Sequence, residues 1–169
     1  MSVAIKRLQN ELKDFNDPVY SEFIIITPQE NPLEWHFTMK GGKGTDYSEG
    51  IYHGKILFPE NYPNSCPPKI VFLNQSGRFE IGVQQCIWLR AGGNDDKWDP
   101  NEHICSYIMG LYSFFESSEN HTGRINSDSQ TKQKLAKESC NYICPSCKEI
   151  KSLFKNKILF NLILLNLNI

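Results

Sequence analysis

The sequence lacks two features that would assign it to a class of protein at once. It has no excess of one charge, since 18 Lys and Arg residues nearly balance 19 Asp and Glu residues, and no global field therefore attracts nucleic acid or an anionic membrane. It also has no apolar signal-peptide core at its N-terminus, so we predict a cytosolic protein with reduced cysteines. A disulfide framework, which the even count of 6 cysteines permits, is the less favoured alternative.

Metal and nucleotide motifs are absent as well. One C-x-x-C pair lies among Cys140, Cys144 and Cys147, but a structural zinc site usually has two paired clusters, and the sequence has no second C-x-x-C and no H-x-x-x-H. We therefore predict no metal ligand and expect these cysteines to pack as small hydrophobic residues. No glycine-rich phosphate loop is present. The histidines are scattered and are expected to be structural or exposed: His36, His53, His103 and His121.

The 169 residues, 40% of them hydrophobic, suit one globular domain with a proper core. Near the N-terminus, apolar residues recur at helical spacing and predict an amphipathic helix that ends at Asp17-Pro18: Ile5, Leu8, Leu12 and Phe15. The opposite face is polar and carries Lys6, Arg7, Asn10 and Lys13. A solvated face and a docking face for a partner both explain this pattern.

Four strands are predicted next, at residues 22–27, 34–40, 51–58 and 69–73. In the second, Trp35, Phe37 and Met39 alternate with polar residues, as a half-buried strand requires. The connections are too short for crossover helices, so the strands should pair as an antiparallel meander. The proline-dense residues 59–68 lack too many amide donors for a sheet and predict a rigid external loop.

Two further helices and an apolar tail are predicted after the strands. Residues 99–102, Asp-Pro-Asn-Glu, have the pattern of a helix N-terminus, and apolar residues continue at helical spacing to Phe115. A third helix is expected from Ser129, with an apolar stripe that reaches Ile150 and a break or kink at Pro145. The tail, residues 153–169, is too short for a confident membrane span, because its 12 apolar-rich residues from Ile158 would reach about 18 Å.

Residues 77–100 contain a single cysteine, Cys86, in a stretch too rich in Gly and Asp to be a helix. A lone cysteine is most often a buried thiol. Here it follows an irregular segment and precedes an acidic, glycine-containing loop, and catalytic groups tend to lie on such loops of a rigid scaffold. We therefore predict that Cys86 is a nucleophile.

The order of these motifs resembles the ubiquitin-conjugating enzymes. The resemblance rests on the N-terminal helix, LEWHF (33–37), EGIYHGKILFPENYP (49–63), Pro67-Pro68, the lone loop cysteine and DKWDP (96–100). SGRF (76–79) and GRINSDSQTKQKLAKES (123–139) resemble the J-type, Ubc-six-like branch. The resemblance implies an α+β ubiquitin-conjugating fold over residues 2–152, with an N-terminal helix, a four-stranded antiparallel meander and C-terminal helices.

The resemblance also implies a mechanism. Cys86 would accept ubiquitin as a thioester from the activating enzyme, which alone uses ATP, and an acceptor lysine, or a serine or threonine, would then attack it. By position, Asp95 and Asp96 are candidates for orienting the incoming amine. The family's asparagine, thought to support the loop or to stabilise the oxyanion, falls on Ser76, and Asn74 would need a local shift to replace it. No cofactor is implied for this chain.

The family's partners imply further sites. The basic residues Lys6, Arg7 and Lys13 match the surface that docks the activating enzyme, and Asn64 falls where a RING-type ligase binds. Pro100 is a further predicted partner-binding residue. The branch is tail-anchored in the endoplasmic reticulum and works in the degradation of misfolded proteins. We therefore predict a cytoplasmic domain, at the cytosolic face of the endoplasmic reticulum if the tail associates with membrane. The alternative is a non-catalytic ubiquitin-binding variant of the same fold.

Overall fold

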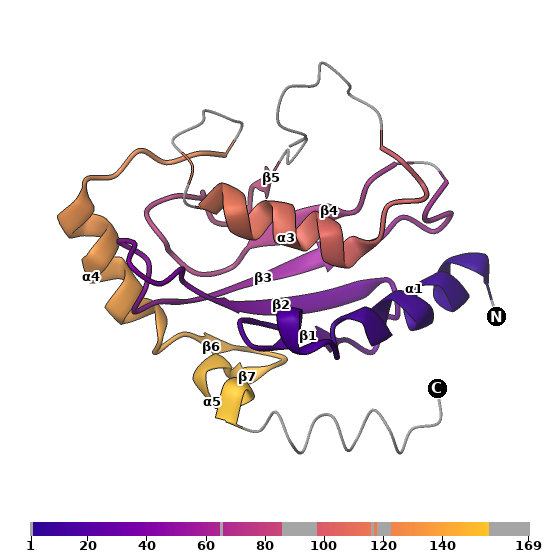
Figure 1. The fold of residues 1–169 in the computed structure, drawn as a ribbon, viewed down its shortest axis with the longest axis horizontal. Helices are drawn as coiled ribbons and strands as arrows, with labels where there is room; N and C mark the ends of the chain where they lie inside the picture. Colours follow the sequence, from indigo (N-terminus) through magenta and orange to yellow (C-terminus); the bar gives the residue numbers. More distant parts are fainter. Residues whose placement is uncertain (1, 65, 86–97, 116, 118–122, 156–169) are drawn as a thin grey trace.

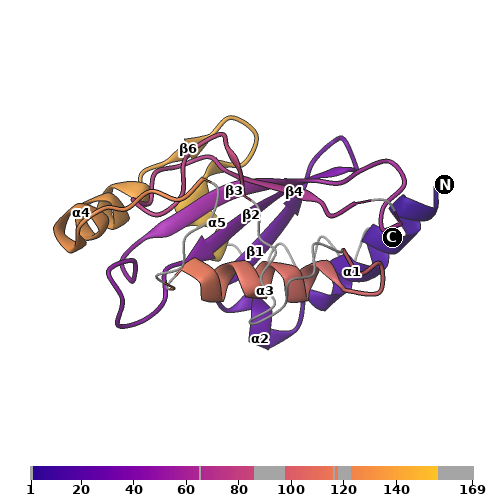
Figure 2. The ribbon, with the colours of Figure 1, turned by 90° about the horizontal axis from the view of Figure 1, so that it is seen from above.

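A computed structural model of the chain describes residues 2–64, 66–85, 98–115, 117 and 123–155. A sheet forms the centre of the molecule (Figure 1). Helices α1 (Val3–Asp14) and α3 (Ile104–Phe115) cover one of its faces. The hairpin of β6 (Ile143–Cys144) and β7 (Lys148–Glu149) lies with α5 (Ile150–Lys155) on the opposite face, as the view from above also shows (Figure 2).

The sheet is the antiparallel meander that the sequence predicts. Its strands follow in spatial order β1 (Ile24–Pro28), β2 (Glu34–Lys40), β3 (Ile51–Leu57), β4 (Lys69–Phe72) and β5 (Gln84–Gln85). Each neighbouring pair is antiparallel. The four predicted strands are present within one or two residues at each end. The fifth is too short for an alternating pattern, and sequence analysis therefore missed it.

Helix α1 begins where Ser2 caps it, since the Ser2 hydroxyl accepts a hydrogen bond from the Ile5 amide at 3.3 Å. Its buried face centres on Ala4, Leu8 and Glu11. The helix ends before Asp17, as predicted, and the Asp17 carboxylate caps the short helix α2 (Pro18–Ser21). The predicted stripe is therefore correct in outline, but a glutamate lies at its centre.

Strand β2 corrects the expectation of a half-buried strand. Trp35, Phe37 and Met39 belong to the main hydrophobic core with α1 and α3. The alternate residues His36 and Thr38 are buried too, at 5% and 0% exposure. The reason is that the C-terminal hairpin and α5 cover the second face of the sheet (Figure 2).

Two predicted helix boundaries are wrong. Helix α3 begins at Ile104 and not at the Asp99-Pro100 turn, where the Asp99 carboxylate accepts from the Asn101 amide at 2.9 Å and closes a local turn instead. Its apolar stripe, which ends at Phe115, is buried as expected. The third predicted helix, α4 (Ser129–Ser139), does not continue to Ile150.

After α4 the chain forms the β6–β7 hairpin, in which Cys144 pairs with Lys148. Pro145 cannot donate a helical hydrogen bond, and Lys148 adopts a positive φ of 64°, which ends helical geometry. Ile143, predicted to lie on the buried stripe, is 65% exposed. Helical spacing in this region was therefore accidental.

Most of the predicted tail lies outside the described residues, which end at Lys155 within α5. Among the helices that the structure describes, none is long and apolar enough to cross a membrane.

Candidate functional site

The segment that leads to Cys86 is held by strand pairing. Gln84 and Gln85 pair with Val71 and Ile70 of β4, and Cys86 follows Gln85 in the sequence. At the other end, Trp98 donates from its indole to the backbone oxygen of Pro63. Cys86, Asp95 and Asp96 themselves lie outside the described residues, and their predicted roles stay predictions. Both chain segments that flank them are attached to the core.

Gln85 adds a side-chain anchor at the end of β5. It is 2% exposed and donates to the backbone oxygens of Val83 at 2.9 Å and Glu80 at 3.4 Å. Gly123 packs against this carboxamide, and a Cβ atom there would lie 2.8 Å from it, with a φ of +82° that already favours glycine. The site therefore requires a glycine beside Gln85, which sequence reasoning did not identify.

Ser76 supports the turn between β4 and β5. Its side chain is fully buried, and its hydroxyl oxygen accepts hydrogen bonds from the amides of Arg78 and Phe79, both at 3.1 Å. An asparagine carboxamide can make the same kind of local bond to the backbone. Ser76 thus has the geometry of a loop support, which is one of the two roles considered for the family's asparagine.

The residues after Ser76 fix this turn in the core. Arg78 is 2% exposed, and its guanidinium donates to the Phe114 oxygen and the Ser117 hydroxyl, each at 3.3 Å. Phe79 stacks on Phe72 with ring centroids 4.4 Å apart. Two backbone hydrogen bonds join the turn to the segment before α4: the Glu80 amide donates to the Gly123 oxygen, and the Ile125 amide donates to the Arg78 oxygen. The turn before β5 is therefore fixed to the core.

Asn74 bonds through its carboxamide to the backbone of other elements. Its carboxamide oxygen accepts from the His53 amide at 2.8 Å, and its nitrogen donates to the Ile51 oxygen at 2.8 Å. A longer bond of 3.5 Å reaches the Ser139 oxygen. Asn74 therefore joins β3 to the end of α4, and these bonds would have to break before it could act near a thioester.

The predicted partner-binding residues lie on α1 and on two loops joined to it. Lys6 and Lys13 are exposed, whereas Arg7 is paired with Glu11 and donates to the Glu102 oxygen at 3.2 Å. Asn64 is exposed, and Pro100 is partly buried. Because Trp98 bonds to Pro63, the loops that carry Asn64 and Pro100 lie side by side. The structure thus brings these residues to one region, while their partners stay predictions.

Glu11 is the residue that builds this region, and sequence analysis missed it. Its side chain is fully buried. It accepts from the Tyr62 hydroxyl at 2.8 Å and from the Ile104 amide at 3.3 Å, and it pairs with Arg7. One carboxylate therefore connects α1, the proline-rich loop and the start of α3. The i,i+4 spacing of Arg7 and Glu11 was the available signal, but it does not reveal burial.

Burial changes the acidity of two side chains in this core. Desolvation, with Glu11 nearby, raises the pKa of Tyr62 above its usual range, so its hydroxyl remains a donor. Desolvation and the neighbouring His36 lower the pKa of His53 to about 3. His53 is therefore neutral at physiological pH. The structure buries His36 and His53, while His103 is exposed and bonds to Asp14; His121 lies outside the described residues.

We expect Ser76→Ala to lower the free energy of unfolding by about 2 kcal/mol, because it leaves two buried amides without an acceptor. Urea denaturation followed by tryptophan fluorescence measures this change. Ser48→Ala, at an exposed position, is the control and should change stability by less than about 0.5 kcal/mol. Equal stability of the two variants would show that Ser76 does not support the turn.

Solved structures confirm the fold that these elements form. A structure titled a putative ubiquitin conjugating enzyme from Plasmodium yoelii is similar with a TM-score of 0.67 and 24% identity, covering 82% of this chain and 96% of that one. Human ubiquitin-conjugating enzyme E2 G1 is similar with a TM-score of 0.57 and 20% identity, covering 67% of this chain and 94% of that one. The predicted ubiquitin-conjugating fold is thus confirmed.

Sequence comparisons define the family. The model of the ubiquitin-conjugating enzyme family matches residues 7–143. Ubiquitin-conjugating enzyme E2 J1 of Mus musculus is 32% identical, over 86% of this chain and 45% of its own length. E2 6 of Kluyveromyces lactis is 35% identical, over 89% and 59% respectively, and E2 J2-like of Dictyostelium discoideum is 34% identical, over 82% and 81%.

The chain therefore belongs to the ubiquitin-conjugating enzyme family, in its J-type branch. It spans about half the length of the first two of these relatives.

Proposed function

We propose that this chain is a ubiquitin-conjugating enzyme that carries ubiquitin as a thioester on Cys86. Family membership over residues 7–143 supports the class of reaction. The observation that carries the assignment to Cys86 is the anchoring of β5, since Gln85 is paired to β4 and buried directly before the cysteine. Ser76 and Arg78 brace the turn that precedes this strand.

The reaction has two transfers. The Cys86 thiolate attacks the carbonyl carbon of ubiquitin's C-terminal glycine, held as a thioester on the activating enzyme, and the thiolate of that enzyme leaves. A neutral acceptor amine, usually of lysine, then attacks the new thioester, and the Cys86 thiolate leaves as the amine loses a proton. Asp95 and Asp96 orient the amine. A serine or threonine hydroxyl is the alternative acceptor.

The surface around Glu11 serves the partners. Lys6 and Lys13 are exposed on α1 and dock the ubiquitin-activating enzyme, with Arg7 beside them. A RING-type ligase binds at the adjoining loops, at Asn64 and Pro100. ATP is consumed by the activating enzyme, and this chain uses no cofactor. The J-type relatives support a role in endoplasmic-reticulum-associated degradation at the cytosolic face of that membrane.

A charging assay tests this function. The full chain is incubated with activating enzyme, ATP and ubiquitin, and we expect a reductant-sensitive adduct of one ubiquitin on non-reducing gels. Omission of ATP should abolish the adduct. If no adduct forms with ubiquitin or other ubiquitin-like modifiers, the enzymatic proposal is wrong. Ubiquitin binding by NMR titration without charging would then identify the non-catalytic variant.

A further inference from the structure

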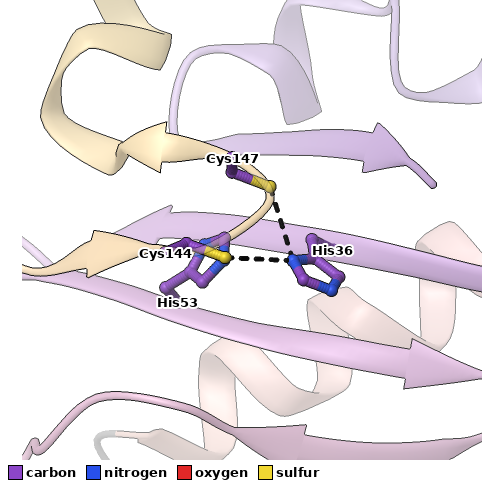
Figure 3. Close-up of side chains that lie close together, drawn as sticks. All are labelled: His36, His53, Cys144 and Cys147. Carbon is purple, nitrogen blue, oxygen red and sulfur yellow. Dashed lines mark hydrogen bonds between the residues drawn. The ribbon is translucent and has the colours of Figure 1, made fainter.

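Four ligand-type side chains, three buried and one partly buried, meet on the face of the sheet opposite α1 and α3 (Figure 3). His36 comes from β2 and His53 from β3, while Cys144 and Cys147 come from the β6–β7 hairpin. His36, His53 and Cys144 are 5%, 0% and 1% exposed, and Cys147 is partly buried. Two residues of the sheet and two of the hairpin thus converge, although about 90 residues separate the pairs in sequence.

The strand register explains why the histidines meet. Thr38 of β2 lies opposite His53 of β3, so His36, two residues from Thr38, is a diagonal neighbour of His53 on the same face. Their ring centroids are 5.3 Å apart. The C-P-S-C turn places both thiols above them, because Cys144 ends β6 and Cys147 precedes β7.

Two of the distances between these side chains match those of a tetrahedral zinc site. The Nδ1 atom of His36 lies 3.5 Å from the Cys144 sulfur and 3.4 Å from the Cys147 sulfur. Bond lengths of about 2.3 Å to sulfur and about 2.0 Å to nitrogen place two such ligands about 3.6 Å apart around zinc. One ligand atom from each of the four residues lies within 4.8 Å of all the others. A small contraction would complete the coordination.

Hydrogen bonding leaves part of this cluster unsatisfied, although the Gln29 amide donates to the Cys147 sulfur at 3.7 Å. Both thiols point at His36 Nδ1 (Figure 3), which offers either one lone pair or one N–H and so forms a full hydrogen bond with only one of them. The Nε2 atom of His53 is buried and has no hydrogen-bond partner among the described residues. Buried polar atoms normally have partners. One cation would satisfy all four groups at once.

Each histidine is also oriented through its other nitrogen. The Nδ1 atom of His53 contacts the Thr38 hydroxyl at 2.8 Å, which leaves Nε2 for a metal. The Nε2 atom of His36 faces the Glu34 carboxylate at 3.2 Å, which leaves Nδ1. Histidines that bind metals commonly donate their second N–H to such a carboxylate or oxygen. The structure therefore provides ligands and the groups that orient them.

We propose that His36, His53, Cys144 and Cys147 bind one zinc ion. A buried set of two sulfur and two nitrogen ligands in tetrahedral arrangement is typical of zinc. With four protein ligands the site is structural, and it fixes the C-terminal hairpin and α5 to the back of β2 and β3. This inference does not depend on the proposed thioester chemistry, since zinc content is measured without ubiquitin.

Zinc content tests the proposal directly. The full chain is loaded with stoichiometric Zn²⁺, passed through gel filtration and measured by plasma mass spectrometry, and we expect about one zinc per chain. The double variant Cys144→Ser/Cys147→Ser should lose it. Cys140→Ser, in the same segment but bonded to the Glu49 oxygen, should keep it. A wild-type chain without zinc, or with a Cys144–Cys147 disulfide instead, would overturn the proposal.

A second group, Asp14, His103 and Cys105, could also hold a cation. It offers a single thiol, and its Asp14 and His103 already bond to each other at 2.7 Å. Cys105→Ser should therefore leave the zinc content unchanged. Co²⁺ in place of zinc distinguishes the groups, because charge-transfer absorption from two thiolates is expected and Cys147→Ser should remove about half of it. Full retention of that absorption in Cys147→Ser would contradict the proposed ligands.

Glu34→Gln tests the site without removing a ligand. Glu34 is partly exposed, so this variant should fold even if the cysteine variants do not. Loss of a partner of a metal-binding histidine commonly lowers metal affinity about 10- to 100-fold, and a competition titration with a chromophoric chelator measures it. Glu149→Gln, at an exposed position on the hairpin, is the control. Unchanged affinity in Glu34→Gln would show that His36 is not oriented for zinc.

Discussion

Replacing Cys86 with serine is expected to convert a reductant-sensitive ubiquitin adduct into one that resists reductant. A serine hydroxyl in place of the thiol would form an oxygen ester, which thiols do not cleave and amines attack slowly. Discharge to free lysine should therefore fall by at least about 100-fold, which corresponds to a barrier higher by about 2.7 kcal/mol. Cys86→Ala should form no adduct, because no nucleophile remains. Non-reducing and reducing gels of the three proteins measure the difference.

Cys66→Ser is the matched control, since Cys66 is exposed and lies in the loop adjoining Trp98. It should charge and discharge at the wild-type rate. An adduct that persists in Cys86→Ala but disappears in Cys66→Ser would move the thioester to the proline-rich loop. It would also leave the anchoring of Gln85 without a catalytic purpose.

Local pattern was sufficient to predict much of the fold. Alternation in β2 and the turn residues between strands identify the meander, because both depend only on neighbours in the sequence. The α3 stripe was equally visible. Strand β5 was not predictable, since its two residues gain their pairing only from β4. The helix expected through Cys140 and Ile150 failed because a spacing of three and four residues also fits a hairpin that Pro145 helps to form.

The site was harder to predict than the fold. Cys86 was predicted from its motif context, and it stays a prediction because it lies outside the described residues. The His–Cys cluster was missed because a search for paired spacing in sequence cannot detect two strands and a hairpin that meet in space. Glu11 was missed for a similar reason, since its partner Tyr62 is 51 residues away. In addition, a helix predicted from the spacing of its apolar residues has every glutamate assigned to its exposed face.

We expect Glu11→Ala to destabilise the fold by about 3 kcal/mol. Breaking a buried ion pair by removing one partner commonly costs about 3 to 5 kcal/mol, and the lower value applies because the Arg7 side chain is 26% exposed and can be hydrated. The change also leaves the buried Tyr62 hydroxyl without its acceptor. Urea denaturation followed by tryptophan fluorescence measures it. The junction of α1 with the loop of Tyr62 and the start of α3 should loosen, so charging at the proposed docking surface should slow.

The control is Glu138→Ala, which removes an exposed glutamate that pairs with Lys134 at 3.9 Å on the helix surface. Such pairs contribute little, and the expected loss is below about 0.5 kcal/mol. Tyr62→Phe separates the contribution of the Tyr62 hydroxyl from that of the ion pair. In a Tyr62→Phe background, Glu11→Ala should lower the free energy of unfolding by less than in the wild type, because no buried hydroxyl is left without an acceptor. If the losses of unfolding free energy in the two single variants simply add in the double variant, Tyr62 and Glu11 act independently. A loss in Glu11→Ala no larger than in Glu138→Ala would mean that the carboxylate does not join α1 to the loops.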